Sequence, residues 1–327
     1  SDLFCAGLGT NMHTDADSMA RNLKEFAEDF LGLDYRKFDV NQHPEIARAA
    51  STVLYNVLIA MGYNAYAAKI LIGILGDDCF PILKMLADFL LKEGLQPSGK
   101  YGTAENNTLR GLIMLMYIWY INPELRDKDF FKYVLPDLYG DDIVAAIKKQ
   151  VIDIFNNLTY ARDCKKYLNM DCTSCEKDKP IVKTMKWDEI IFLKSRFIFR
   201  DKWNRYVTPL EMSSLTKTLE WYIPSPAITV AAQAIASMAS CLWELFFHCE
   251  DEIQYDKTRS QFIAWIEEYY EVPERLIAFP TYEEILVKLG FEEEIQHEYK
   301  MMEQPWCGDN PYFFVLNQEG AVLDNKQ

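Results

Sequence analysis

The chain has 327 residues, half of them hydrophobic, so it can bury the core of one large domain or of two smaller ones, and a disordered protein is excluded. A net charge of −15 and a pI near 4.8 exclude a protein that binds nucleic acid over its whole surface, although a local basic groove is compatible with them. The first residues do not resemble a secretory signal, so we expect the cysteines to be free thiols in a reducing compartment.

Hydrophobic periodicity and capping residues predict short, alternating elements in the first two thirds of the chain. In chain order we expect a helix over 14–30, a strand over 31–40, helices over 45–61 and 65–75, a helix or a strand over 82–91, and a helix over 103–120. Apolar segments over 130–138 and 143–146 should lead into and out of a turn, the stretch 147–169 should be helical at first and then turn-like, and 183–187 and 190–199 should form a hairpin of strands. This mixture predicts an α+β fold, with a small antiparallel sheet covered by helices.

After residue 205 the pattern becomes helical, which predicts a boundary between a domain over 1–205 and a mainly helical domain over 206–327. The expected helices lie at 209–222, 227–247, 260–270 and 282–289. The run 227–247 is the longest apolar one, but polar residues such as Gln233 and Glu244 interrupt it, so a buried helix explains it better than a membrane span. Residues 304–327 match no pattern.

Cys172 and Cys175 form a Cys-x-x-Cys pair with Cys164 nearby, a spacing that can hold zinc. A fourth ligand is not obvious, because His248 and Cys249 lie far along the chain. We therefore do not favour a zinc site.

Paired aspartates follow a glycine in Tyr139-Gly140-Asp141-Asp142. Glycine tolerates the positive φ of a tight hairpin turn, so both carboxylates are expected at one tip, where their repulsion favours a bound cation such as Mg²⁺ or Mn²⁺. A solvated acidic turn is the alternative. The same tripeptide recurs at 76–78, where we expect a helix terminus with its acids near the start of the next helix, so the tripeptide alone decides nothing.

Asp34 lies at the end of an apolar strand. Placed beside Asp141 and Asp142, it would complete a carboxylate cluster able to hold two divalent ions, which clamp the attacking and leaving oxygens of an in-line phosphoryl transfer.

A second group of polar residues could bind a ribose with its 2′-OH. Asp39 follows the strand of Asp34, Ser98 and Gly99 lie in a loop, and Thr103 and Asn107 share one face of the next helix. In the alternative interpretation Thr103 caps the helix and Asn107 is an exposed polar residue.

Taken in order, these residues resemble motifs A, B and C of RNA-directed RNA polymerases. The motifs are Asp34-x-x-x-x-Asp39, Ser98-Gly99-x-x-x-Thr103-x-x-x-Asn107 and Tyr139-Gly140-Asp141-Asp142, and the first is particularly similar to the picornavirus-like group. Phe192-Leu193-Lys194 resembles motif E, and Tyr206-x-x-Pro209-Leu210 resembles the start of the thumb. Four ordered motifs together are a strong signal, although each alone is weak.

The resemblance implies a polymerase palm with motifs A to E over 1–205, followed by a helical thumb, and template-directed RNA synthesis in viral replication. Asp34, Tyr35, Asp141 and Asp142 would hold two Mg²⁺ or Mn²⁺ ions. Asp39, Ser98, Gly99, Thr103 and Asn107 would bind the nucleotide and sense its 2′-OH.

Basic residues have implied roles as well. Lys179, with Lys177 as the alternative, would be the general acid toward the leaving pyrophosphate, whereas a solvated charged loop is the other interpretation of these lysines. Lys194 and Arg196 would contact the primer backbone.

By the same resemblance the partners are an RNA template and primer, ribonucleoside triphosphates, other viral replication proteins, and a fingers segment that is missing ahead of Asp34. We therefore expect the isolated chain to be inactive. The expected location is the host-cell cytoplasm, at membrane-associated replication complexes and without a transmembrane segment.

Two rival functions remain. A reverse transcriptase would use the same metal cluster, but it typically has a bulky residue in place of Asn107 and no glycine at the position of Gly140. A non-catalytic palm-fold scaffold would have no need of three adjacent charges at Asp34, Asp141 and Asp142.

Overall fold

The computed structural model describes residues 5, 7, 9–97, 99–176 and 179–291. The chain forms two compact units. Among the described residues, the first contains those up to Thr10 and Leu23–Phe192, and the second contains Asn11–Asn22 and those from Leu193 to residue 291. The chain passes from the first unit to the second at Leu193, and an N-terminal segment belongs to the second unit.

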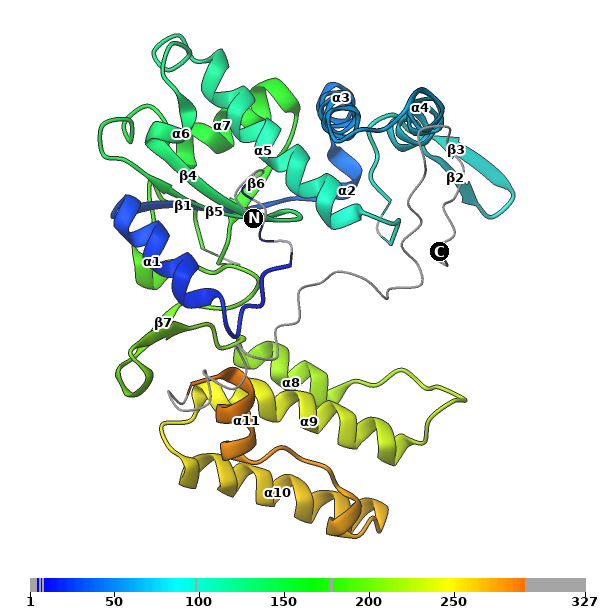
Figure 1. Cartoon of the computed structure of the whole chain (residues 1–327), viewed down its shortest axis with the longest axis vertical. Coiled ribbons are helices and arrows are strands. Elements are labelled where there is room, and N and C mark those ends of the chain that lie inside the picture. Colours follow the sequence, from blue (N-terminus) through cyan, green and yellow to red (C-terminus); the bar gives the residue numbers. More distant parts are fainter. Residues whose placement is uncertain (1–4, 6, 8, 98, 177–178, 292–327) are drawn as a thin grey trace, which may run out of the picture. The chain divides into compact units, whose positions relative to one another are not determined.

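The first unit is built on a four-stranded antiparallel sheet with the order β4-β5-β1-β6 (Figure 1). Its strands are β4 (Val134–Tyr139), β5 (Asp142–Ile147), β1 (Asp29–Tyr35) and β6 (Cys172–Ser174). At the edge, Gly7 N donates to Leu138 O at 2.7 Å and Leu138 N donates to Cys5 O at 2.9 Å, so the N-terminal residues pair with β4.

Two helices, α5 (Thr103–Ile121) and α7 (Asn157–Leu168), supply the core that covers the sheet. Leu33 of β1 and Ile143 of β5 belong to this core together with Trp119 of α5 and Tyr160 of α7, all of them at most 2% exposed. Because side chains alternate between the faces of a strand, the residues that follow Leu33 and precede Ile143 point to the opposite face.

The remaining elements of the first unit lie between β1 and α5 or flank the sheet. They are α2 (Phe38–Asn41), α3 (Pro44–Ala60), α4 (Ala65–Cys79), the hairpin of β2 (Ile82–Met85) and β3 (Asp88–Leu91), α6 (Phe130–Tyr133) and the 3₁₀ helix η1 (Trp187–Glu189). Helix α3 packs against both α4 and α5.

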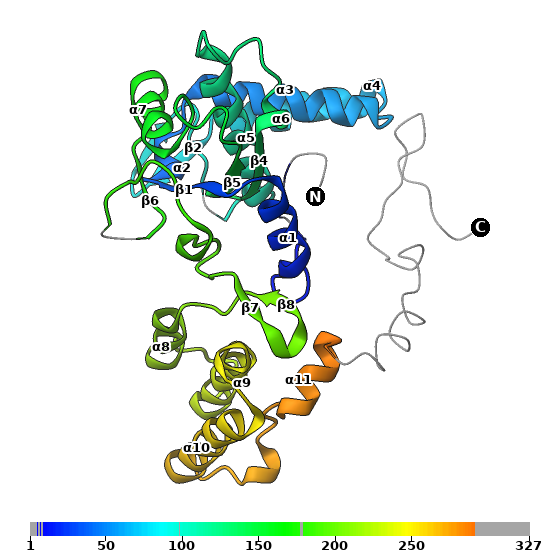
Figure 2. The same cartoon turned by 90° about the vertical axis from the view of Figure 1, so that its left-hand side faces the viewer.

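The second unit is mainly helical (Figure 2). It contains the first part of α1 (Ala16–Phe26), the short hairpin of β7 (Ile198–Arg200) and β8 (Arg205–Val207), the helices α8 (Met212–Glu220), α9 (Val230–His248), α10 (Glu252–Tyr270) and α11 (Tyr282–Leu289), and the 3₁₀ helices η2 (Asp201–Trp203) and η3 (Glu274–Leu276). The expected α+β fold is confirmed, because a small antiparallel sheet under helices is followed by a helical region.

Helix α9 is the one helix among the described residues that is long and apolar enough to cross a membrane, by length and composition alone. Its C-terminal half carries Leu242, Phe246 and Phe247, which are fully buried in the core of the second unit. This burial accounts for the apolar residues of the C-terminal half, whereas only 28% of the helix's apolar window is buried in all.

The hairpin expected from 183–187 and 190–199 is wrong. Met185 instead bridges to Phe30 of β1, and the backbone then takes the left-handed conformation at Leu193 (φ 52°) and Lys194 (φ 58°), which a strand does not accommodate. The strand that follows, β7, pairs with β8 across a later turn.

Three further boundaries differ from those expected. The strand placed over 31–40 ends at Tyr35, because Lys37 is left-handed (φ 55°) and begins α2. Segment 82–91 is the hairpin β2–β3, and the stretch 147–169 is a strand end and turns followed by α7. In a short apolar run, periodicity alone does not tell a helix from a strand.

Candidate active site

The hairpin β4–β5 carries the paired aspartates at its tip. Tyr139 pairs with Asp142, so Gly140 and Asp141 alone form the turn. Gly140 has φ 63°, in the left-handed region where glycine is favoured, and Asp141 is exposed. The sequence-based expectation of a tight acidic turn is confirmed at this hairpin.

Asp34 lies next to this tip, on the neighbouring strand. Leu33 of β1 pairs with Ile143 of β5 in the antiparallel ladder, and the same register continued by one residue places Asp34 opposite Asp142. Directly opposite residues point to the same face, with Cβ atoms about 4.5–5.5 Å apart. Both carboxylates are half-buried and lie on the face away from the α5–α7 core.

A divalent cation would suit this donor set in its chemistry, because hard carboxylate oxygens at strand ends are the ligands that Mg²⁺ and Mn²⁺ prefer. Within the described part of the chain, however, no three His, Cys, Asp or Glu side chains are close enough together to hold a metal. The backbone nevertheless brings the three aspartates to one edge of the sheet. The same finding gives no support to a zinc site at Cys172 and Cys175.

Tyr35 is directed away from this carboxylate face. Its hydroxyl forms a 2.5 Å hydrogen bond with that of Tyr160 in α7, and both rings are buried. Burial raises the pKa of both phenols well above 10.0, so each stays neutral and keeps a proton for this bond. A metal contact at Tyr35 would therefore have to come from its main chain.

Helix α5 carries the residues expected to sense the ribose. Asn107 is 8% exposed, and its Oδ1 atom has no hydrogen-bond partner within the described structure. A buried acceptor without a partner costs free energy, which a ligand hydroxyl could recover. The alternative in which Asn107 is an exposed polar residue is wrong.

Thr103 opens α5, one turn before Asn107. The cap is Gly102 (φ 70°), so Thr103 is not the N-cap residue, and its Oγ1 donates instead to Lys100 O at 2.6 Å. Gly99, with φ 87°, is exposed in the preceding loop, and Ser98 lies outside the described residues.

Asp39 is half-buried in α2, and its main chain is hydrogen-bonded to the loop that precedes α5. Its carbonyl accepts from Gln96 N at 2.9 Å, which ties α2 to the loop before α5. The structure thus brings the segment of Asp39 to the loop of Gly99.

The second Gly-Asp-Asp tripeptide lies in the last turn of α4, and β2 follows it. The expected helix end is confirmed, but the expected helix after it is wrong, so no helix dipole offsets the two acids. Asp78 forms an ion pair with Lys100 instead, and Asp77 is exposed.

The lysine proposed as general acid is exposed. Lys179 Nζ forms an ion pair with Glu176 at 2.9 Å, and its side chain is 64% exposed. Lys177 lies outside the described residues. Lys194 and Arg196 belong to the second unit, where Lys194 is exposed and Arg196 is half-buried.

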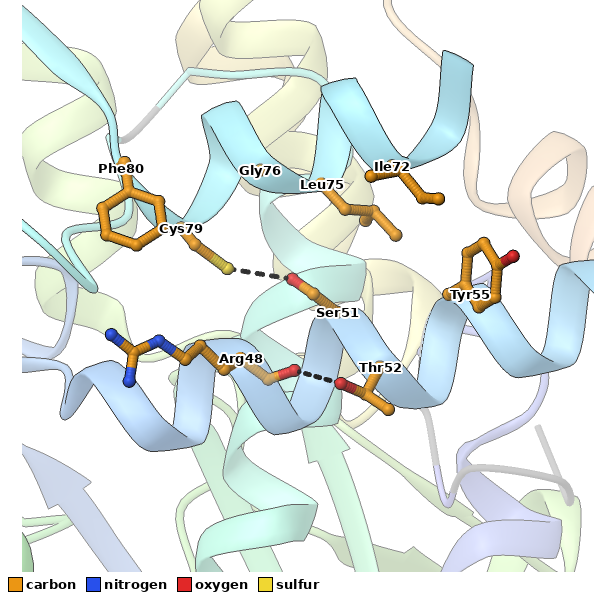
Figure 3. A pocket seen from close by; sticks show the side chains of 9 residues that line it. All are labelled: Arg48, Ser51, Thr52, Tyr55, Ile72, Leu75, Gly76, Cys79 and Phe80. Atoms are coloured by element: carbon orange, nitrogen blue, oxygen red, sulfur yellow. Dashed lines mark hydrogen bonds between the residues drawn. The ribbon is translucent and has the colours of Figure 1, made fainter. Parts of the chain in front are cut away.

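A separate groove of about 380 Å³ lies between α3 and α4 (Figure 3). Apolar side chains such as Leu75 and Phe80 line it, with Arg48 at one side, and Ser51 Oγ lies 3.3 Å from Cys79 Sγ. None of the aspartates that form the candidate active site lines this groove.

Four residues of the site were missed from the sequence. Thr108 accepts a hydrogen bond from Gly140 N at 2.8 Å, Gly111 packs against the hairpin, and Tyr160 holds Tyr35. Arg110 is fully buried and donates to Gly94 O and Asn106 Oδ1, and burial lowers its pKa to about 10. Two of these residues could have been noticed in the sequence, because Arg110 and Gly111 interrupt an otherwise apolar helix.

Comparisons with known proteins agree with this geometry. A family model described as viral RNA-dependent RNA polymerase matches residues 2–254. The chain is 26% identical over 295 residues to the replicase polyprotein of Drosophila C virus, covering 85% of this chain and 16% of the polyprotein. It is 29% identical over 171 residues to that of Cricket paralysis virus, covering 50% of this chain and 9% of the polyprotein.

Among solved structures, the chain resembles a Sicinivirus 3Dpol RNA dependent RNA polymerase with a TM-score of 0.71 and 14% identity. The match covers 89% of this chain and 56% of that polymerase, so the chain spans little more than half of the solved relative and shares its fold. The match to the family model covers well over half of the sequence, and the relatives come from picornavirus-like viruses, as the ordered motifs predicted. The chain belongs to the viral RNA-dependent RNA polymerase family.

Proposed function

We propose that this chain supplies the catalytic palm and the thumb for template-directed RNA synthesis in viral replication. The observation that supports the proposal is the β1–β5 register: its last pair is Leu33–Ile143, so Asp34 and Asp142 are the next residues on the two strands, beside the turn of Asp141. Membership of the polymerase family supports it.

Polymerases of this family use divalent metals, and we propose that Asp34, Asp141 and Asp142, with the main chain of Tyr35, hold two Mg²⁺ or Mn²⁺ ions. Bound there, such ions supply the positive charge that stabilises the attacking and leaving oxygens of nucleotidyl transfer. Without that charge the three carboxylates would repel one another.

The nucleotide is proposed to lie between this edge and α5. Asn107 Oδ1 would accept from the ribose 2′-OH, because it is a buried acceptor that has no partner within the described structure. Thr103, Gly99 and Ser98 would line the same sugar, and Asp39 would approach it from α2, which the Gln96–Asp39 bond holds near the loop.

Proton transfer is assigned to Lys179. It would protonate pyrophosphate as the bond between the α-phosphorus and the bridging oxygen breaks and the primer 3′-oxygen bonds to that phosphorus. Lys179 is paired with Glu176, so it has to leave that carboxylate to do so, and Lys177 stays the alternative.

The proposed partners are an RNA template and primer, with Lys194 and Arg196 on the primer phosphates, together with ribonucleoside triphosphates and a fingers segment. We also propose a location at membrane-associated replication complexes in the host cytoplasm. Matching the chain to only 56% of the solved relative is compatible with a fingers segment supplied by further polypeptide.

Calorimetric titration of the chain with Mn²⁺ tests the metal site directly. The Asp34→Asn and Asp141→Asn variants should each lose binding, whereas Asp77→Asn, which alters the exposed acid of α4, should bind as the unaltered chain does. Equal binding by all four proteins would refute the proposed site.

A further inference from the structure

A buried side chain of helix α5 hydrogen-bonds the backbone of the β4–β5 turn. The Gly140 backbone N–H donates to Thr108 Oγ1 at 2.8 Å, and Thr108 is 1% exposed. Water therefore has little access to the bond, and loss of the acceptor would leave the Gly140 N–H buried without a partner. A contact of this kind fixes a turn more firmly than an exposed hydrogen bond does.

The helix reaches the turn because Gly111 has no side chain. A Cβ atom at Gly111 would lie 3.0 Å from Leu138 Cδ2 and 3.9 Å from the carbonyl oxygen of Gly140. The first distance is shorter than ordinary van der Waals contact, so the Leu138 side chain would have to shift to admit a larger residue at position 111. Thr108 and Gly111 lie three residues apart, on the same side of the helix.

The turn has little freedom of its own. Only Gly140 and Asp141 lie between the paired residues Tyr139 and Asp142. Fixing the Gly140 amide therefore fixes the backbone that carries Asp141, the one exposed carboxylate of the three at this edge.

The same helical turn carries the acceptor proposed for the ribose. Asn107 precedes Thr108 directly, so the position of its buried Oδ1 relative to Gly140 is set through two adjacent residues of one helix. A helix transmits displacement as a rigid body over so short a distance.

We infer that Thr108 is a positioning residue that couples ribose recognition at Asn107 to the placement of Asp141. The inference rests on the proposed function. A ribose bound to Asn107 fixes the position of α5, and α5 fixes the Gly140–Asp141 turn through Thr108. A ribonucleotide therefore favours the geometry in which the carboxylates bind metal. A 2′-deoxyribose has no 2′-OH to contact Asn107, so it does not fix α5 in this way.

Two substitutions separate this coupling from a general need for packing. Thr108→Val keeps the shape of the side chain and removes the acceptor, whereas Thr108→Ser keeps the acceptor and removes a methyl group. If Thr108 only filled space, the serine variant would be the more damaged one. If it positions the turn, the valine variant is damaged and the serine variant is rescued.

Amide hydrogen exchange at Gly140 tests the contact without any need for activity. We expect slow exchange in the unaltered chain and in Thr108→Ser, and exchange at least about tenfold faster in Thr108→Val under conditions where all three are folded by circular dichroism. Unchanged exchange in Thr108→Val would overturn the inference.

Mn²⁺ titration and sugar selection then test the coupling. Thr108→Val should lower Mn²⁺ affinity about tenfold, the scale found for residues that orient metal ligands, while Thr108→Ser stays within about twofold. In the longest natural polypeptide that contains residues 1–327, Thr108→Val should also reduce the preference for ribonucleotides over deoxyribonucleotides. Normal Mn²⁺ affinity and normal preference in Thr108→Val would overturn the inference and leave the proposed function standing. Absence of Asp141-dependent synthesis in the unaltered polypeptide would refute the function itself, whatever the exchange result.

Discussion

Asp34 and Asp142 directly follow the last pair of the β1–β5 ladder, Leu33–Ile143, on their two adjacent antiparallel strands. Like charges placed in this way destabilise a sheet by about 0.2–1 kcal/mol. The fold therefore carries a cost at the position where the proposed chemistry needs negative charge.

This arrangement predicts that removing one charge stabilises the protein while it removes metal binding. In the presence of a chelator, Asp142→Asn should unfold at a higher temperature than the unaltered chain, by up to about 1 kcal/mol in free energy of unfolding. With Mn²⁺ added, only the unaltered chain should gain stability, because a ligand stabilises the state that binds it. Differential scanning calorimetry in both conditions measures this, and a Mn²⁺-induced shift in Asp142→Asn as large as that of the unaltered chain would contradict the account.

Asn107→Ala should reduce the preference of the enzyme for ribonucleotides over deoxyribonucleotides. Removing the buried Oδ1 acceptor removes the contact proposed for the 2′-OH, so ribonucleotide incorporation should fall about tenfold or more while deoxyribonucleotide incorporation changes little. Single-nucleotide incorporation kinetics in the longest natural polypeptide that contains residues 1–327 measure both.

The adjacent Asn106 provides a matched control. It accepts a hydrogen bond from Arg110 Nε at 2.9 Å, so Asn106→Ala should lower thermal stability without changing the ratio between the two sugars. Equal loss for both sugars in Asn107→Ala would show that Asn107 is structural.

The buried Tyr35–Tyr160 pair predicts a loss of stability in alkali. Burial raises the pKa of both phenols above the ordinary 10.0, so the folded protein retains protons that the unfolded chain releases. The stabilisation is complete below about pH 10 and is lost as the pH rises beyond it, because the unfolded state then binds fewer protons.

Chemical denaturation at a series of pH values from neutral to alkaline measures this slope. The double variant Tyr35→Phe with Tyr160→Phe has no phenol at either position, so its stability should decline less steeply above about pH 10 than that of the unaltered chain. Parallel curves of unfolding free energy against pH for the two proteins would mean that the Tyr35–Tyr160 pair does not contribute to the loss of stability in alkali.

The acids of α4 should be dispensable for chemistry. Asp77 is exposed, and Asp78 forms an ion pair with Lys100 in the loop before α5. Asp78→Asn leaves the buried Lys100 Nζ without its anionic partner, so it should lower stability but leave RNA synthesis largely intact. Loss of synthesis in a folded Asp77→Asn, Asp78→Asn double variant would show that the wrong tripeptide was assigned to catalysis.

Much of the site could be predicted from the sequence, because its elements are local and strongly patterned. A glycine before two acids predicted the β4–β5 turn, and an apolar run ending at Asp34 predicted most of β1. The long helix from Thr103 was expected nearly to its observed end at Ile121, because its apolar periodicity is unbroken.

The contacts that hold the site were not predictable, because each joins residues far apart in the sequence. Nothing local indicates that Thr108 meets Gly140 or that Tyr35 meets Tyr160. The hairpin expected near residue 190 failed for the same reason, since Met185 pairs with Phe30 of a distant strand.

Primer extension tests the central claim most directly. The assay compares the longest natural polypeptide that contains residues 1–327 with its Asp141→Ala variant, on an RNA template and primer with Mg²⁺, and uses Asp77→Asn as the control for loss of an exposed acid. The account predicts extended RNA from the unaltered protein and from Asp77→Asn, and at least about a hundredfold less from Asp141→Ala. Equal extension by the unaltered protein and Asp141→Ala would contradict it.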